Sequence, residues 1–189
     1  MRCVILYAGK KSGRVPKESR RKYMLKLGVC TVVENIEAVA AAGFDYLETS
    51  LAGIAAMENP AFEEAYHQVM DAPIGVEVCN CMIPPTLALT GPNVCVDQIE
   101  TYLAHAFGRA ARLGGRLIVF GSGAARQVPD GFPMEAAMRQ IEAFLHLCIP
   151  HCESTGIRIA IEPLRKAETN VLNTLREGMA LAQRVDHPA

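Results

Sequence analysis

The sequence predicts an α/β fold, namely a partial (β/α)8 TIM barrel of about five βα units with parallel strands. Apolar runs typical of strands alternate with helical stripes through residues 24–189, and helices between successive strands imply parallel pairing. The units average roughly 33 residues, so eight would need about 265, near the ~250 typical of a barrel. A doubly wound open sheet also fits the alternation. The unit length favours the barrel, and residues 185–189 resemble the approach to a sixth strand. We therefore predict a barrel cut after its fifth helix.

The predicted strands are short apolar runs between turn residues, and they span 25–30, 44–49, 74–82, 117–120 and 157–162. Each is followed by apolar side chains at helical spacing, over 32–42, 61–72, 99–113, 138–152 and 172–185. Gly43, Gly114 and Gly156 follow three of these helices, as glycine commonly does at a helix end. Pro150 predicts a kink near the end of the fourth helix.

Residues 1–23 form a basic N-terminal extension, and residues 24–189 form the barrel segment. The extension holds eight Lys and Arg against one Glu, and it shows no helical or strand period. Met24 offers an alternative start, so we expect the extension to lie outside the fold and to be removable. A closed barrel would pair its first strand with an eighth. We therefore expect open sheet edges near Leu27 and Ile159, which favour a homo-oligomer.

Composition excludes several classes of protein. Half of the 189 residues are apolar and 21% are charged, which excludes disorder and a coiled coil. No apolar run approaches the roughly 20 residues that span a bilayer, so we expect no membrane partner. Residues 24–189 hold 11 Lys and Arg against 19 Asp and Glu, a net charge of −8 that argues against a nucleic-acid partner. The seven cysteines include no CxxC pair, which is typical of free thiols in a reducing cytoplasm.

The active site of a barrel lies at the carboxyl ends of its strands, where this chain places four polar residues: Glu48, Asn80, Ser122 and Glu162. Strand alternation puts Glu162 on the face opposite the isoleucines of its strand, and so toward the barrel axis. A carboxylate there needs a partner. A divalent metal or substrate hydroxyls would serve, and so would a salt bridge to Arg165 or Lys166.

The turn at residues 121–123 has the sequence Gly-Ser-Gly, and Arg126 follows it. Such a turn can cradle an anion through backbone N–H groups, with the arginine binding a phosphate. Glycines are also common in βα turns for steric reasons alone. The five histidines do not lie at strand ends, and Ser122 has no evident His or Asp partner, so a serine nucleophile is not predicted.

Four segments together resemble the sugar phosphate isomerase/epimerase family of the xylose-isomerase-like TIM-barrel superfamily, which includes D-tagatose 3-epimerases. They are LGVCTVVENIEAVAAAGFDYLE, CNCMIPPTLALTGPNV, VFGSGAARQVPDGF and IAIEPLRKAETNVLNTL. The most specific element is Glu-Pro-Leu at a strand end, with a second glutamate six residues after the first, here Glu162 and Glu168. The family often has Asn-Arg after this motif, whereas this chain has Arg165 and Lys166.

The resemblance implies that Glu162 is both a metal ligand and an acid/base, and that Glu168 contacts the sugar. Glu48, Asn80, Ser122 and Arg126 are the further candidate substrate contacts. The cofactor implied is a divalent metal ion (Mn, Mg, Co or Zn), whose other ligands come from strands six to eight in the family.

The function implied is a sugar or sugar-phosphate isomerase or epimerase, which moves a proton between adjacent carbons through an enediolate. We expect the 189-residue chain alone to be inactive or nearly so. An inosose dehydratase-like lyase and a non-catalytic partial barrel are the alternatives. An abasic-site endonuclease is disfavoured by the acidic barrel segment.

Overall fold

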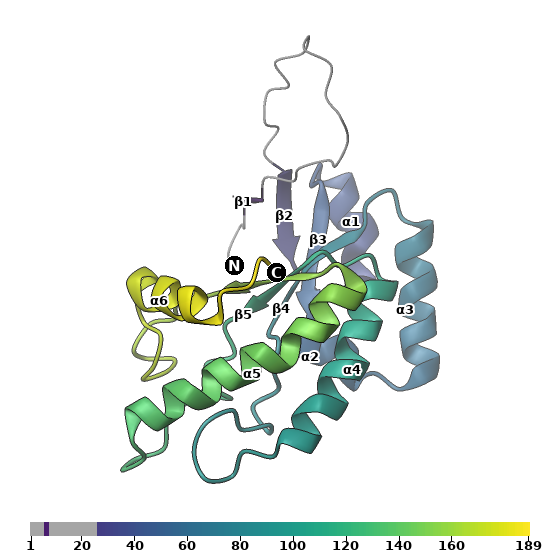
Figure 1. Cartoon of the computed structure of the whole chain (residues 1–189). Helices are drawn as coiled ribbons and strands as arrows, with labels where there is room; N and C mark the ends of the chain where they lie inside the picture. The colour runs from purple at the N-terminus through teal and green to yellow at the C-terminus, as the bar shows by residue number, and fades with distance from the viewer. Residues whose placement is uncertain (1–5, 8–25) are drawn as a thin grey trace.

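The computed structural model describes residues 6–7 and 26–189, and it contains one six-stranded sheet (Figure 1). The strands are arranged across the sheet in chain order: β1 (Leu6–Tyr7), β2 (Lys26–Cys30), β3 (Tyr46–Ser50), β4 (Val76–Asn80), β5 (Leu117–Phe120) and β6 (Arg158–Ile161). Strands β2 to β6 are parallel, and β1 is antiparallel to β2. The five predicted parallel strands are therefore confirmed, within one or two residues at most ends.

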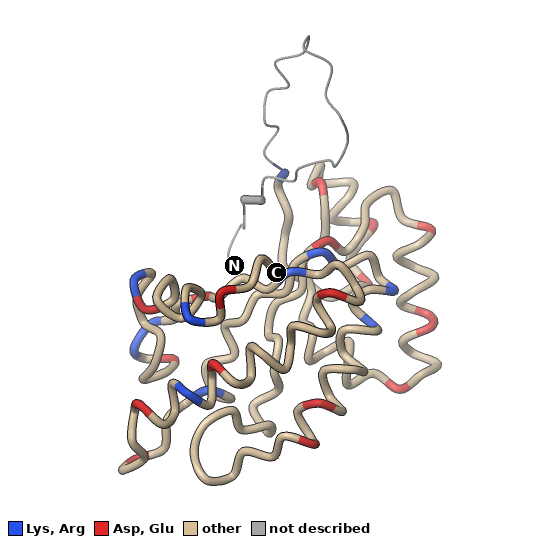
Figure 2. The backbone as a smooth tube through the Cα atoms, viewed as in Figure 1, with Lys and Arg blue, Asp and Glu red and all other residues tan. Residues whose placement is uncertain are grey.

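Within residues 26–189, six helices connect successive parallel strands, and one more follows β6. The connecting helices are η1 (Val33–Asn35), α1 (Ile36–Ala41), α2 (Leu51–Ala56), α3 (Asn59–Asp71), α4 (Val96–Arg112) and α5 (Met134–Thr155), and the helix after β6 is α6 (Leu175–Val185). Helix α2 is absent from the sequence prediction. It begins directly after β3, where the Ser50 side chain accepts a hydrogen bond from the Gly53 N–H at 3.0 Å. Helix α5 contains Pro150 and ends at Gly156, whose φ of 72° is left-handed. Figure 2 shows acidic residues along α3 and charges of both signs around α6.

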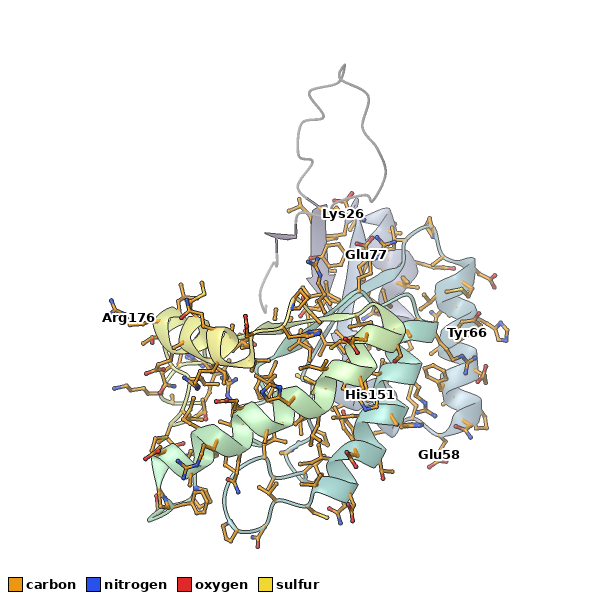
Figure 3. All side chains as sticks on the ribbon, viewed as in Figure 1. Lys26, Glu58, Tyr66, Glu77, His151 and Arg176 are labelled. Carbon is orange, nitrogen blue, oxygen red and sulfur yellow. The ribbon has the colours of Figure 1, made fainter. Side chains whose placement is uncertain are left out.

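The two faces of the sheet have different environments. Leu47, Cys79 and Ile118 lie on the face that the helices cover, in one core with Phe107 of α4 and Phe144 of α5. The opposite face carries a separate small cluster of Tyr46, Val78 and Val119, all buried. This second face is the concave, barrel-axis side of the fold. At the amino-terminal end of the strands, Lys26 of β2 forms an ion pair with Glu77 of β4 (Figure 3).

The two edges of the sheet differ from the prediction in part. Leu6 pairs with Leu27 and Tyr7 pairs with Lys26, so the first predicted edge is not open near Leu27. Apart from Leu6 and Tyr7, the extension of residues 1–23 falls outside the described residues, and its dispensability stays a prediction. At the other edge, no described strand pairs beyond β6. Beside that edge, α5, β6 and α6 line an apolar groove of about 360 Å³.

The concave face leaves no room for a side chain at Gly28. A Cβ on Gly28 of β2 would overlap the ring of Tyr46 from β3. We expect Gly28→Ala to lower the free energy of unfolding by about 1–3 kcal/mol, the usual cost of overpacking. Urea denaturation measures this loss.

Gly108→Ala in α4 is the matched control. A Cβ there meets no atom within 4 Å. Alanine also favours a helix over glycine by about 1 kcal/mol, so this variant should be as stable as the parent or more so. Equal stability of the two variants would contradict the packing argument.

Candidate active site

The carboxyl ends of β2 to β6 surround a cavity of about 800 Å³ on the concave side of the sheet. Five of the six predicted site residues line it: Glu48, Asn80, Ser122, Glu162 and Glu168. They come from three strand ends and two following loops, and they meet because parallel strands end at the same edge of a sheet. The position of these residues at the carboxyl ends of parallel strands was therefore enough to predict that their side chains lie around one cavity.

Glu162 comes immediately after β6 and lines the cavity. Ile159 and Ile161 line the apolar groove on the helical side instead, which confirms the predicted alternation. The carboxylate lies against Gly121 so closely that a Cβ there would overlap its Oε2 atom. Burial raises the pKa of Glu162; the positive charge of Arg126 opposes this shift and the negative charge of Glu168 adds to it.

Arg165 forms a different ion pair from the one considered for Glu162. Its Nε donates to Oε2 of Glu168 at 3.0 Å, across the loop after β6. The pair holds Glu168 at the rim of the cavity, with its side chain 39% exposed. The salt bridge with Arg165, which would have given Glu162 a purely structural role, is therefore formed by Glu168 instead.

Glu48 and Asn80 lie together on the wall formed by β2, β3 and β4. The Asn80 side chain donates from Nδ2 to Oε1 of Glu48 at 2.8 Å and to Sγ of Cys30 at 2.8 Å. Glu48 is only 3% exposed. Burial raises its pKa; the Asn80 hydrogen bond lowers it, and the charge of Glu162 adds a smaller increase.

Cys30 is a residue of this wall that the sequence analysis missed. It ends β2 and lines the cavity. The signal that identified Glu48 could also have identified Cys30, since Cys30 likewise lies at the carboxyl end of a parallel strand. Counting cysteines together as buried apolar residues concealed its position.

The Gly-Ser-Gly turn after β5 has a steric role. A Cβ on Gly123 would come within 2.7 Å of the Glu168 backbone oxygen, and Gly121 faces the Glu162 carboxylate. Ser122, at a φ of 41°, accepts a hydrogen bond on its Oγ from the Ile83 N–H at 2.9 Å. The turn therefore joins two loops at the cavity, and its glycines allow close approach of backbone and carboxylate.

The prediction that Arg126 binds a phosphate is wrong as to its position. Its side chain is fully buried and lies behind the cavity wall, not on it. The guanidinium donates to the carbonyl oxygens of Phe120 at 3.0 Å and Glu162 at 2.8 Å. It lies over the Phe120 ring at 5.2 Å, and burial lowers its pKa to about 10. Arg126 thus connects the ends of β5 and β6 from inside the protein.

The described residues do not by themselves complete a metal site. Among residues 6–7 and 26–189, no group of three or more His, Cys, Asp and Glu is placed to hold a metal ion. Glu162 offers an oxygen donor of the type that hard divalent ions prefer.

The comparisons place the chain in a family. Residues 36–189 match the family model described as xylose isomerase-like TIM barrel, and the chain belongs to that family. A comparison of the sequence with curated proteins finds no match.

Within the described part of the chain, no helix combines the length and apolar character that crossing a membrane requires.

Solved structures with the same fold include three epimerases. The 3-keto-D-glucoside 4-epimerase from E. coli has a TM-score of 0.68 at 14% identity, over 84% of this chain and 64% of that one. The D-psicose 3-epimerase of Clostridium cellulolyticum H10 with D-tagatose has a TM-score of 0.69 at 18% identity, over 85% and 60%. An L-ribulose 3-epimerase has 0.68 at 19% identity, over 87% and 58%. This chain therefore spans about three fifths of their lengths.

Glu48 should make stability depend on pH. Its pKa is raised in the folded state, so ionising it costs folding free energy, and stability falls as the pH rises above the unfolded value of about 4.3. Glu48→Gln removes the charge and keeps an acceptor for Asn80. We expect this variant to melt at a higher temperature than the parent at pH 7 and at an equal temperature at pH 4.

Glu63→Gln is a control of opposite sign. Arg112 forms a bidentate pair with Glu63 and lowers the pKa of that carboxyl, so its contribution is present above the unfolded pKa and lost on acidification. This variant should melt slightly lower than the parent at pH 7 and equally at low pH. A Glu48→Gln variant that melts lower at pH 7 would contradict the burial argument.

Arg126 should act as an internal clamp and not as an anion ligand. Arg126→Met leaves the two carbonyl oxygens without their donor, and we expect a loss of about 2–4 kcal/mol in the free energy of unfolding. Inorganic phosphate at about 10 mM should leave the melting temperature of the parent unchanged in a scanning fluorimetry experiment, because the guanidinium is out of its reach. A phosphate-dependent rise that disappears in Arg126→Met would restore the ligand role.

Proposed function

We propose that the chain carries the proton-transfer side of a sugar isomerase or epimerase site. The observation that supports this most directly is the placement of Glu162. It is a partly buried carboxylate at a strand end, facing a cavity large enough for a monosaccharide, with a raised pKa. The family match and the fold shared with sugar epimerases support the same conclusion.

The reaction needs a base that removes a proton from a carbon next to a carbonyl group. Loss of that proton gives an enediolate, and its return to the other face or to the neighbouring carbon gives the epimer or the isomer. Glu162 takes the proton on its carboxylate and can return it on the same face of the enediolate, as isomerisation requires. Return of a proton to the opposite face, as epimerisation requires, needs a second acid that would face Glu162 across the substrate. Burial suits this role, because a pKa nearer neutrality makes the carboxylate a stronger base and its acid form a better donor.

The other described residues orient the substrate and hold Glu162 in place. Glu168 lies at the rim, where its carboxylate can accept hydrogen bonds from sugar hydroxyls. Gly121 gives the Glu162 carboxylate its space, and Arg126 fixes the backbone carbonyl of Glu162. The site therefore combines a base with supports that come from its own strand and the strand beside it.

A divalent metal ion (Mn, Mg, Co or Zn) belongs to the proposal through the family resemblance. Such an ion, when bound, polarises a substrate carbonyl and stabilises the negative oxygen that develops. Glu162 would be its ligand from this part of the chain, and the further ligands lie outside the described residues. We therefore propose that the 189-residue chain alone binds metal weakly and has little or no epimerase activity, while Glu162 still exchanges a carbon-bound proton slowly. No observation favours the lyase alternative over this one.

Exchange of a carbon-bound proton with solvent tests the proposal. The chain is incubated in D₂O with Mn²⁺ and D-tagatose, and deuterium next to the carbonyl is followed by NMR. We expect slow incorporation by the parent and none above background with Glu162→Gln, because the amide cannot take the proton.

Glu64→Gln, on the exposed side of α3, is the matched control and should exchange at the rate of the parent. Two results contradict the proposal. One is exchange that survives Glu162→Gln, and the other is no exchange by the parent at saturating sugar.

A further inference from the structure

The wall of the cavity on β2, β3 and β4 has an unusual hydrogen-bonding character. Asn80 has one NH₂ group, and both of its hydrogens are used inside the wall, on Glu48 Oε1 and on Cys30 Sγ. An ionised carboxylate can only accept, so Glu48 fixes which way the amide faces. The side-chain atoms left for a ligand are the Asn80 carbonyl oxygen and Glu48 Oε2.

These two oxygens are acceptors, and no described residue donates a hydrogen bond to either of them. Glu48 is 3% exposed and lines the cavity. Glu48 Oε2 is not among the fully buried side-chain oxygens that lack a partner, so this oxygen keeps contact with the cavity, where a ligand can donate a hydrogen bond to it. Sugar hydroxyl groups are donors of that kind.

The charges around the cavity exclude an anionic group from this wall. Glu48, Glu162 and Glu168 all line the cavity. Arg165, the cation that lines it, is paired with Glu168. Arg126 lies behind the wall, where its two terminal nitrogens donate to backbone carbonyls and its buried Nε has no partner among the described residues. A phosphate would therefore meet acceptors and negative charge where it needs donors and positive charge.

We propose that Glu48 and Asn80 form a hydroxyl-recognition site for the end of the sugar remote from Glu162, and that this site selects free sugars over their terminal phosphates. The inference rests on the proposed function in assuming a sugar ligand, but it concerns binding and not turnover. Strands β4 and β5 lie between β3 and β6, so the two carboxylates face different parts of the same ligand. Substrate choice and proton transfer are thus assigned to different walls of the cavity.

Titration calorimetry with D-tagatose and D-tagatose 6-phosphate tests the inference on the whole chain. The parent should bind the sugar at least tenfold more tightly than the phosphate. Glu48→Gln replaces a charged acceptor with an amide that can also donate, so it should weaken sugar binding about five- to tenfold and reduce the preference to threefold or less. Asn80→Ala should weaken sugar binding similarly, and it serves if Glu48→Gln melts before the titration temperature.

The controls separate this inference from the proposed function. Glu162→Gln should keep the preference for the free sugar while losing solvent exchange, and Glu64→Gln should match the parent in both. Equal or tighter binding of the phosphate by the parent overturns the inference. So does a tenfold preference that persists in both Glu48→Gln and Asn80→Ala. Binding of neither compound by the parent contradicts the proposed function itself.

Discussion

The structure depends on one constraint, the alternation of side chains along parallel strands whose connecting helices all cover the same face. The covered face must be apolar, because helices pack against it, and it holds Leu47, Cys79 and Ile118 in one core with α4 and α5. The other face carries none of the described helices and packs its own side chains together on the concave side of the sheet. It is apolar in the middle, at Tyr46, Val78 and Val119, and polar at the carboxyl ends. That division is what makes a cavity with carboxylates at one end of the sheet.

Arg126 illustrates how such a cavity is held in shape. A fully buried guanidinium is costly to desolvate, and burial lowers its pKa to about 10. Hydrogen bonds to the carbonyl oxygens of Phe120 and Glu162 and the nearby charge of Glu162 offset part of that cost. These hydrogen bonds of Arg126 join the carboxyl ends of β5 and β6 at the point where Glu162 follows the strand. The position of the proposed base thus depends on a residue that does not reach the cavity.

Prediction from the sequence succeeded where short-range geometry decides the outcome. Glu162 was placed correctly because alternation within one strand decides its face, and Glu48 and Asn80 because strand ends share an edge. Helix α2 was missed because Leu51–Ala56 is too short to show a helical period and begins after β3 without a turn. Arg126 was misplaced because a long side chain in a loop can reach either side of the cavity wall. The two-residue strand β1 also has no period to detect, since its place is set by pairing with β2.

The central claim is that one sugar molecule lies across the strand ends, with Glu162 at one part of it and Glu48 at another. A crystal structure of the chain soaked with D-tagatose tests it most directly. We predict density for the sugar in the cavity, with a carbon-bound proton facing the Glu162 carboxylate and a hydroxyl group donating to Glu48 Oε2. Sugar bound in the apolar groove of α5 and α6, or a Glu162 carboxylate turned out of the cavity, would contradict this claim.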